Sequence, residues 1–360
     1  MKSLLTRLRV HTLGLARVLP QKAPETGMVH ETRQRTGQQK LAPTPRQNEH
    51  DAVRQIATRA FAPDALLHAW RKVRANGGGP GIDGEDLRKF EARLQPNLAS
   101  LRAELLSGSY RPLPVWRVSI PKPNGGRRPI SILAVRDRIA QRAAHDALAP
   151  LFEPHFLPCS FGFREGRSIH DAVAAVICHR DAGLRHVVDG DISRCFEHIN
   201  HDLLMQFVAR SINDKLMLSL IRKWLKARVF NDMPNAAEAE SDVGALQGSA
   251  MSPLLSNIYL HQFDVALTNS SSATPTTALV RYADDWLILC RREVDAKRAL
   301  IDATHALSQL HLNVNPHRTR IASFDAGFAF LGAFFIRDEH YWISPSSRSS
   351  RPVTGERLTR

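Results

Sequence analysis

The stretch RYADDWLIL, residues 281–289, places two adjacent acidic residues, Asp284 and Asp285, between two apolar runs. The flanking runs predict two β-strands joined by a tight turn, so both carboxylates should lie at one end of a sheet. At about 4 Å, two like charges repel by roughly 4 kcal/mol at an effective dielectric near 20. A bound cation, a shared proton or a solvent-exposed turn could each offset this repulsion.

A second acidic stretch, HVVDGDI at 186–192, predicts another short strand. Asp189 and Asp191 lie two residues apart, so in a regular strand they point to the same face. Three carboxylates that converge at one sheet edge would form a hard-oxygen site suited to Mg²⁺ or Mn²⁺. The alternative, that each Asp is only a turn former or a strand end, stays open at this point.

The composition predicts two or three domains or subdomains and a basic protein, which suits nucleic-acid binding but also occurs in proteins that are merely soluble. The chain has 360 residues, 43% of them hydrophobic and 23% charged, which is enough to bury a large core. A net charge of +14 favours a polyanionic partner, with nucleic acid first and an anionic membrane surface second. No apolar run reaches the roughly 20 residues that a membrane span needs.

Cysteine and histidine positions argue against a zinc or disulfide framework. The four cysteines occur singly, without a C-x-x-C pair: Cys159, Cys178, Cys195 and Cys290. This pattern is typical of a protein from a reducing cytoplasm. His198 and His201 could share a helix face, but no further ligand lies near them in the sequence, so a metal site there is disfavoured.

Periodicity predicts an α/β (α+β) protein with a mostly antiparallel sheet. Residues 1–50 are polar and basic and predict a flexible arm, with a surface helix near the start as the alternative. Helical patterns cover 51–74, 87–106, 136–151, 168–180, 202–228, 256–267 and 294–310. Strand patterns cover 117–120 and 128–132, joined by the hairpin signal PKPNGG, then 186–192, the runs beside ADD, and FAFLGAFFI at 328–336 as one strand.

The tetrad YADD at 282–285 resembles the reverse transcriptase active site, and it stands in an ordered series of motifs. The others are GGGPGIDG (77–84), VSIPKPNGGRRPISILAVRDRIAQ (118–141), SFGFREGRSIHDAV (160–173), VVDGDISRCFEHINHDLL (187–204), GALQGSAMSPLLSNIYL (244–260) and FAFLGAFF (328–335). In this order, from about residue 65 to 345, they resemble the group II intron-like bacterial reverse transcriptases. The resemblance implies the fingers and palm of a right-hand polymerase, with an antiparallel palm sheet.

The resemblance also implies a division of the chain. Residues 51–180 would form a fingers-like region with an N-terminal helical extension, and 181–345 the palm with its catalytic carboxylates. The basic arm at 1–50 would precede them, and 346–360 would be a polar basic tail or the start of a thumb. A thumb is therefore expected to be largely absent or truncated.

Site residues follow from the same resemblance. Asp191, Asp284 and Asp285 would be catalytic and hold the metal ions, with Ile192 among the metal ligands. The aromatic residue five positions after the first Asp, Phe196, would act as a steric gate against the ribose 2′-hydroxyl.

Further residues would bind substrate. Lys122 and Arg128 match basic fingers residues that contact the incoming triphosphate, since a flexible ammonium and a planar guanidinium both suit phosphates. Gln247 and Gly248 match a loop that packs against the nascent base pair and the template. Arg318 stands where the family usually has Lys, which argues against a Lys-specific acid role because Arg barely titrates. Asp189 does not match a catalytic position and is expected to be a strand residue with at most an electrostatic influence.

The implied activity is RNA-directed DNA polymerisation, in which the enzyme adds dNTPs to a primer 3′-hydroxyl by a two-metal mechanism. The expected ions are Mg²⁺, with Mn²⁺ as the alternative. The partners would be an RNA template, a DNA primer and dNTPs, in the cytoplasm and without a membrane. In its short length and in the stretches NIYLHQFDVAL and FDAGFAFLG, the chain resembles the CRISPR-associated enzymes of this family. The resemblance implies that it works with the Cas1–Cas2 integrase. The alternatives are a group II intron-encoded or domesticated enzyme, an antiphage defence enzyme, a terminal transferase or protein-primed enzyme, and a non-catalytic RNA-binding protein with this fold.

Overall fold

The structure is a computed structural model that describes residues 55–121, 127–231, 244, 248–269 and 277–343. All of them fall within one unit of the chain, Pro45–Arg360. The predicted arm at 1–50 and the tail at 346–360 lie outside the described residues.

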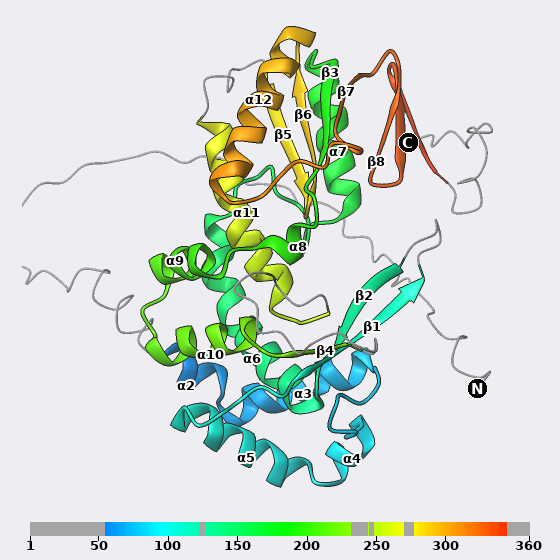
Figure 1. Cartoon of the computed structure of the whole chain (residues 1–360). Coiled ribbons are helices and arrows are strands. Elements are labelled where there is room, and N and C mark those ends of the chain that lie inside the picture. Colours follow the sequence, from blue (N-terminus) through cyan, green and yellow to red (C-terminus); the bar gives the residue numbers. More distant parts are fainter. Residues whose placement is uncertain (1–54, 122–126, 232–243, 245–247, 270–276, 344–360) are drawn as a thin grey trace, which may run out of the picture. The chain divides into compact units, whose positions relative to one another are not determined.

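A four-stranded antiparallel sheet in the order β5-β6-β3-β7 carries the acidic stretches (Figure 1). Its strands are β5 (Thr277–Tyr282), β6 (Asp285–Cys290), β3 (His186–Asp191) and β7 (Arg320–Ser323). The hairpin predicted around ADD is therefore confirmed, and so is the antiparallel sheet. The register places Asp191 directly opposite Asp285.

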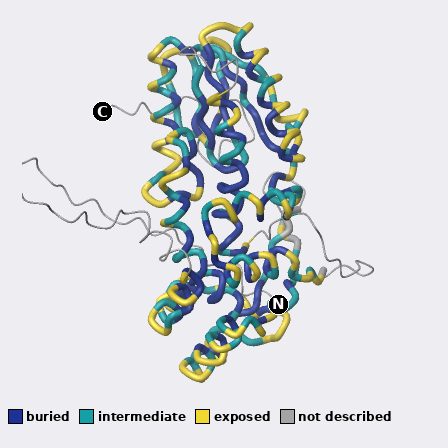
Figure 2. The backbone as a smooth tube through the Cα atoms, turned by 90° about the vertical axis from the view of Figure 1, so that its left-hand side faces the viewer, coloured by how far each residue is buried: buried dark blue, intermediate teal, exposed yellow. Residues whose placement is uncertain are grey.

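Side chains along the sheet alternate between two hydrophobic clusters, as the period of two requires. Trp286 and Ile288 pack with the helices α11 (Ser252–Thr268) and α12 (Glu293–Gln309) on one face. Leu287 and Leu289 pack on the other face with α7 (Ile169–Asp181), so helices cover both sides of the sheet (Figure 1). Figure 2 shows buried positions gathered inside and exposed positions along the outer faces of helices. Each fully buried side chain of this size contributes about 1.5–3 kcal/mol to stability.

The glycine of VVDGD has a packing role that its sequence context did not reveal. Gly190 lies opposite Trp286 in the β3–β6 register. A Cβ atom at position 190 would lie 2.2 Å from Cζ2 of Trp286, so the indole covers the glycine backbone. Any larger residue would push the indole away from β3, the strand that ends in Asp191.

The prediction of one strand over 328–336 is wrong. The stretch forms a hairpin of β8 (Phe328–Phe330) and β9 (Ala333–Ile336), extended by β10 (Glu339–Trp342). Leu331 and Gly332 make the two-residue turn with φ values of 51° and 83°. A left-handed pair of this kind is the turn that matches the twist of two antiparallel strands. The continuous apolar character of the stretch concealed it.

Three long helical patterns are each broken in the structure. The pattern at 51–74 splits after Ala60, the pattern at 87–106 splits at Arg93, and the pattern at 202–228 splits before Asp214. The Asp214 carboxylate accepts the Met217 N–H at 3.0 Å as an N-cap and the Ala57 N–H at 2.8 Å. A capping side chain satisfies backbone donors at a helix start, so Asp214 begins a new helix instead of continuing the old one.

A helical layer lies beside a second, three-stranded sheet in the order β2-β1-β4, whose β1–β2 hairpin projects away from the helices (Figure 1). The strands are β1 (Val115–Pro121), β2 (Arg127–Ile132) and β4 (Val229–Asn231). The β1–β2 hairpin confirms the PKPNGG prediction, whereas the parallel strand β4 was not predicted. The helices are α2 (Ile56–Ala60), α3 (Pro63–Asn76), α4 (Leu87–Ala92), α5 (Leu94–Ser107), α6 (Val135–Phe152), α9 (His201–Ser211) and α10 (Lys215–Leu225).

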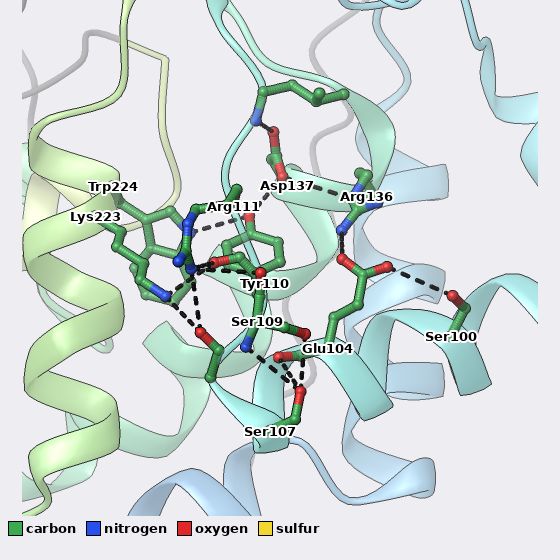
Figure 3. Close-up of polar contacts among 12 residues, drawn as sticks. Ser100, Glu104, Ser107, Ser109, Tyr110, Arg111, Arg136, Asp137, Lys223 and Trp224 are labelled. Atoms are coloured by element: carbon green, nitrogen blue, oxygen red, sulfur yellow. Dashed lines mark hydrogen bonds and ion pairs between the residues drawn. The ribbon is translucent and has the colours of Figure 1, made fainter.

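The loop that leads from α5 into β1 is anchored by buried polar contacts from α6 and α10 (Figure 3). The Tyr110 hydroxyl donates to Asp137 Oδ1 at 2.5 Å, and the Leu113 N–H donates to Oδ2 at 2.9 Å. From α10, Trp224 Nε1 donates to the Tyr110 hydroxyl at 3.2 Å, and Lys223 Nζ donates to the Tyr110 carbonyl at 2.9 Å. The start of the β1–β2 hairpin is thus tied to two helices.

Burial raises the pKa of Asp137 to about 6, although the bonds from Tyr110 and Leu113 favour the ionised form. Its ordinary value is 3.8, so between about pH 4 and pH 6 the folded state binds this proton more tightly than the unfolded chain does. The free energy of unfolding from this group therefore falls as the pH rises through that window.

We expect Asp137→Asn to remove this pH dependence. The wild type should lose thermal stability relative to the variant as the pH rises from 4 to 7, because only the wild type must ionise a buried carboxyl. The measurement is the unfolding midpoint of both proteins across this range, with the exposed Asp202→Asn as control. Parallel midpoint curves for wild type and Asp137→Asn would contradict the prediction.

Candidate catalytic site

Three predicted carboxylates meet where β3 ends and β6 begins. Asp191 is the last residue of β3, and Asp285, the first of β6, lies opposite it. The Ile192 N–H donates to the Asp284 carbonyl at 3.3 Å, which joins the turn to the end of β3. The structure therefore places the three Asp residues and Ile192 at the same end of the sheet.

The turn that carries Asp284 has an unusual backbone. Tyr282 pairs with Asp285, so Ala283 and Asp284 form a two-residue hairpin turn. Ala283 has φ 58°, in the left-handed region that favours glycine. A non-glycine residue there costs roughly 1–2 kcal/mol, so surrounding contacts must hold the turn.

Arg281 supplies those contacts from a fully buried position. Its Nε and Nη2 each donate to one oxygen of Asp264 at 2.6 Å. Nη1 donates to the carbonyl of Ala283 at 3.0 Å and to Oδ1 of Asn257 at 3.2 Å. Nη2 also donates to Ser160 Oγ at 2.8 Å, so all five guanidinium N–H groups are used.

The Arg281–Asp264 pair is a bidentate ion pair without solvent exposure on either side chain. Burial disfavours the charged guanidinium, but the Asp264 carboxylate outweighs it, and the pKa of Arg281 is raised. Because Asp264 lies on α11 and Arg281 on β5, the pair fixes the turn to the helix beneath it.

The segment around Gly162 packs directly on the same turn. The Phe161 N–H donates to the Arg281 carbonyl, and the Arg281 N–H donates to the Cys159 carbonyl, both at 2.8 Å. A Cβ atom at position 162 would lie 2.4 Å from the Ala283 nitrogen, so only glycine allows this approach. Part of SFGFREG thus serves as a support for the acidic turn.

The carboxylates influence one another strongly. Burial, then Asp284 and Asp191, raise the pKa of Asp285 to about 6, while Arg318 opposes the rise. Arg318 Nη1 donates to Asp191 Oδ1 and Asn315 Nδ2 donates to Oδ2, both at 2.8 Å. A divalent cation would relieve this repulsion, and carboxylate oxygens are the donors that Mg²⁺ and Mn²⁺ prefer.

The donor set fits such an ion chemically, but it is not already arranged as a cage. Among the described residues, no three His, Cys, Asp or Glu side chains have converged into metal-binding geometry. The Asp191 carboxylate is instead engaged by Arg318 and Asn315. An ion at this corner would compete with Arg318 and Asn315 for the Asp191 carboxylate, and the Arg318 side chain is 66% exposed.

A cavity of about 630 Å³ opens beside the carboxylates. The cavity is lined by acidic and basic side chains and by the tip of the β8–β9 hairpin. The lining includes Asp189, Asp191, Asp285, His317, Arg318, Arg320, Phe330, Leu331 and Gly332. A cavity with both carboxylates and guanidinium groups suits a ligand that carries phosphates and a cation.

Asp189 stands apart from the acidic turn. Its Oδ2 accepts from Arg320 Nε at 3.1 Å, and burial raises its pKa. It also adds to the raised pKa of Asp285. This agrees with the expectation of a strand residue whose influence is electrostatic.

The predicted substrate residues are only partly described. Phe196 is half-buried on α8 (Cys195–His198), and Gly248 has φ 105°. A Cβ atom at 248 would lie 2.7 Å from the Ser131 carbonyl oxygen on β2, so glycine is required there. Arg128 pairs with Ile120 in the β1–β2 hairpin. Lys122 and Gln247 lie outside the described residues.

Motifs and local patterns did not reveal the residues that hold the site together: Arg281, Asp264, Asn257, Ser160, Gly162, Gly190 and Asn315. One signal was visible, because an Arg inside the apolar strand LVRY needs a buried partner. The partner itself, Asp264, lies in another element and has no local signal.

Comparisons with known proteins agree with this geometry. The family model described as reverse transcriptase (RNA-dependent DNA polymerase) matches residues 120–335. Protein YkfC of Escherichia coli (strain K12) is 36% identical over 312 residues, which cover 76% of this chain and 81% of YkfC. The group II intron-encoded protein LtrA of Lactococcus lactis subsp. cremoris is 34% identical over 225 residues, covering 60% of this chain and 36% of LtrA.

The chain therefore spans little more than a third of the length of LtrA. Among solved structures, a partial Cas6-RT-Cas1–Cas2 complex is 23% identical with a TM-score of 0.43, covering 69% of this chain and 40% of that chain. A likeness at that level carries no conclusion about function. Among the described residues, the helices are too short or too polar to cross a membrane.

We expect Arg281→Met to lower the free energy of unfolding by about 3–5 kcal/mol, because it leaves Asp264 buried and unpaired. Denaturant unfolding measures this change. Adding Asp264→Asn to the same chain should restore part of the loss, since it removes the orphan charge. Arg292→Met breaks an exposed pair with Asp295 and serves as the matched control. Equal effects at 281 and 292 would refute a structural role for the buried pair.

Proposed function

The chain belongs to the reverse transcriptase (RNA-dependent DNA polymerase) family, and we propose that the corner formed by Asp191, Asp284 and Asp285 is its catalytic centre. The reaction is the RNA-templated addition of dNTPs to a primer 3′-hydroxyl. The observation that carries this proposal is the register of Asp191 opposite Asp285, with Asp284 joined to the end of β3. Similarity to the group II intron-encoded protein LtrA supports the resemblance to group II intron-like members.

Asp191, Asp284 and Asp285 would hold the divalent ions, for which we propose Mg²⁺, with the Ile192 backbone beside them. When bound, such ions activate the attacking hydroxyl and stabilise the leaving pyrophosphate. The chain's own contribution is to hold the carboxylates at one corner, through the Arg281 network and the sheet register.

Other residues are proposed to bind and orient the substrates. Lys122 and Arg128 would contact the triphosphate, and Phe196 would face the sugar. Gln247 and Gly248 would pack against the nascent base pair. The tight approach of Gly248 to Ser131 supports a fixed position for Gly248. This assignment corresponds to a fingers-like region at 51–180 and a palm at 181–345.

A non-catalytic RNA-binding protein is the alternative from another class. Such a protein has no physical need for three mutually repelling carboxylates at one buried corner. The raised pKa of Asp285, caused by burial and by its acidic neighbours, marks that cost and favours the enzyme.

The biological partner is a question separate from the chemistry. The motif resemblance to CRISPR-associated members supports a Cas1–Cas2 partner, whereas the similarity to LtrA supports an intron-encoded or domesticated enzyme. Neighbouring cas1 and cas2 genes would favour the first, a flanking intron RNA the second, and a defence island a third. All four cysteines are free, which supports a reducing cytoplasm as the place of action.

We expect the purified chain to extend a DNA primer on an RNA template with Mg²⁺, and Asp191→Asn or Asp285→Asn to slow extension by about 10³-fold or more. The loss of several kcal/mol of charge stabilisation sets this scale. Asp284→Ala together with Asp285→Ala should abolish extension. Asp189→Asn, on the same strand face, should stay much nearer to the wild-type rate. Extension by the double variant at the wild-type rate would overturn the site. Replacing Mg²⁺ with Mn²⁺ tests the choice of ion.

Phe196→Ala is expected to raise rNTP incorporation relative to dNTP by roughly tenfold or more, because a bulky ring no longer excludes the 2′-hydroxyl. The kcat/KM values for a dNTP and its matching rNTP give this ratio. An unchanged ratio would remove Phe196 from the gate role.

A further inference from the structure

Phe163 combines two features that a phenylalanine seldom shows together. Its side chain is 52% exposed, and its φ of 60° lies in the left-handed region. A bulky residue in that region is strained, and such strain persists where the surroundings impose it, most often at functional sites. The ring belongs to neither of the large hydrophobic clusters, so burial does not explain the conformation.

Both neighbours of Phe163 are held rigidly. The Gly162 carbonyl accepts from Asn257 Nδ2 at 2.8 Å, and the Gly162 backbone abuts Ala283 of the acidic turn. On the other side the buried Arg164 donates from Nη1 to the Ser160 carbonyl at 2.8 Å. The chain between these anchors has little freedom, and the left-handed residue projects its ring outward.

The ring of Phe163 meets the edge of Phe196. Their centroids are 6.3 Å apart with an interplanar angle of 77°, an edge-to-face pair. Phe196 sits on the one-turn helix α8, whose preceding residue, Arg194, also has a left-handed backbone at φ 45°. Phe196 is half-buried and packs against the main hydrophobic cluster, and the Phe163 ring gives it a further contact from outside that cluster.

We propose that Phe163 is a positioning residue for nucleotide selection. Its ring braces Phe196, so that the gate keeps the rotamer that excludes a ribose 2′-hydroxyl. The inference rests on the proposed function and deepens it. Gly162, the residue before Phe163, packs on the turn that carries Asp284. The position of the Phe163 ring is therefore fixed relative to the proposed catalytic corner.

The test is the ratio of kcat/KM for an rNTP to that for the matching dNTP in single-nucleotide primer extension. Phe163→Ala should raise this ratio about 2- to 12-fold, the range that an aromatic pair of this geometry is worth. Phe163→Tyr keeps the aromatic ring, so its ratio should equal that of the wild type. In a Phe196→Ala background, Phe163→Ala should add no further change, because there is no ring left to brace.

A stability measurement separates this role from a merely structural one. Phe163→Gly relieves the left-handed strain, so its unfolding midpoint should not fall, yet its nucleotide ratio should rise as in Phe163→Ala. Ile301→Ala, which truncates an exposed apolar residue on α12, is the control and should leave the ratio unchanged.

The outcomes are distinct. A wild type that does not extend primers refutes the proposed function and the brace together. A wild type that extends, with an unchanged ratio in Phe163→Ala, refutes the brace alone. An increase of equal size with and without the Phe196 ring also refutes it, since Phe163 would then act independently of the gate.

Discussion

The buried ion pair between Arg281 and Asp264 is the interaction on which the site depends. Arg281 donates a hydrogen bond to the Ala283 carbonyl in the strained turn. Its bonds to Asp264 and Ser160 link β5 to α11 and to the segment at Ser160. A buried pair of this kind adds little net stability compared with apolar packing, but removing one partner is costly. Its value here is geometric, because it confines Asp284 to one place.

The acidic corner formed by Asp191, Asp284 and Asp285 concentrates charge that the rest of the fold must tolerate. Burial and two acidic neighbours raise the pKa of Asp285, while Arg318 and Asn315 hold Asp191. Gly190 lets Trp286 cover the opposite face, so the strand ends stay close despite their repulsion. Repulsion among these carboxylates lowers stability, and a protein that only binds RNA gains nothing in return. A protein that binds divalent cations can offset the repulsion with the bound ions.

The same principle extends to the helical layer and to the gate. Asp137 anchors the approach to the β1–β2 hairpin through Tyr110 and Leu113, with a carboxyl whose pKa is raised by burial. Phe163 braces Phe196 from a strained backbone in our proposal. In each case, a polar or strained group is held by contacts that are distant in sequence.

Local patterns in the sequence determined the strands of the ADD hairpin, the PKPNGG hairpin and most helices, and they singled out the three carboxylates of the proposed site. These follow from periodicity, turn residues and motif order, which act over a few residues. The turn inside FAFLGAFF escaped because its apolar residues concealed a left-handed pair. Only the tertiary structure decided which residue satisfies Arg281, why position 190 is glycine and what holds Asp191. Asp264, Trp286 and Asn315 come from other elements, up to 124 residues away, and such pairings are set by packing, which no local pattern encodes.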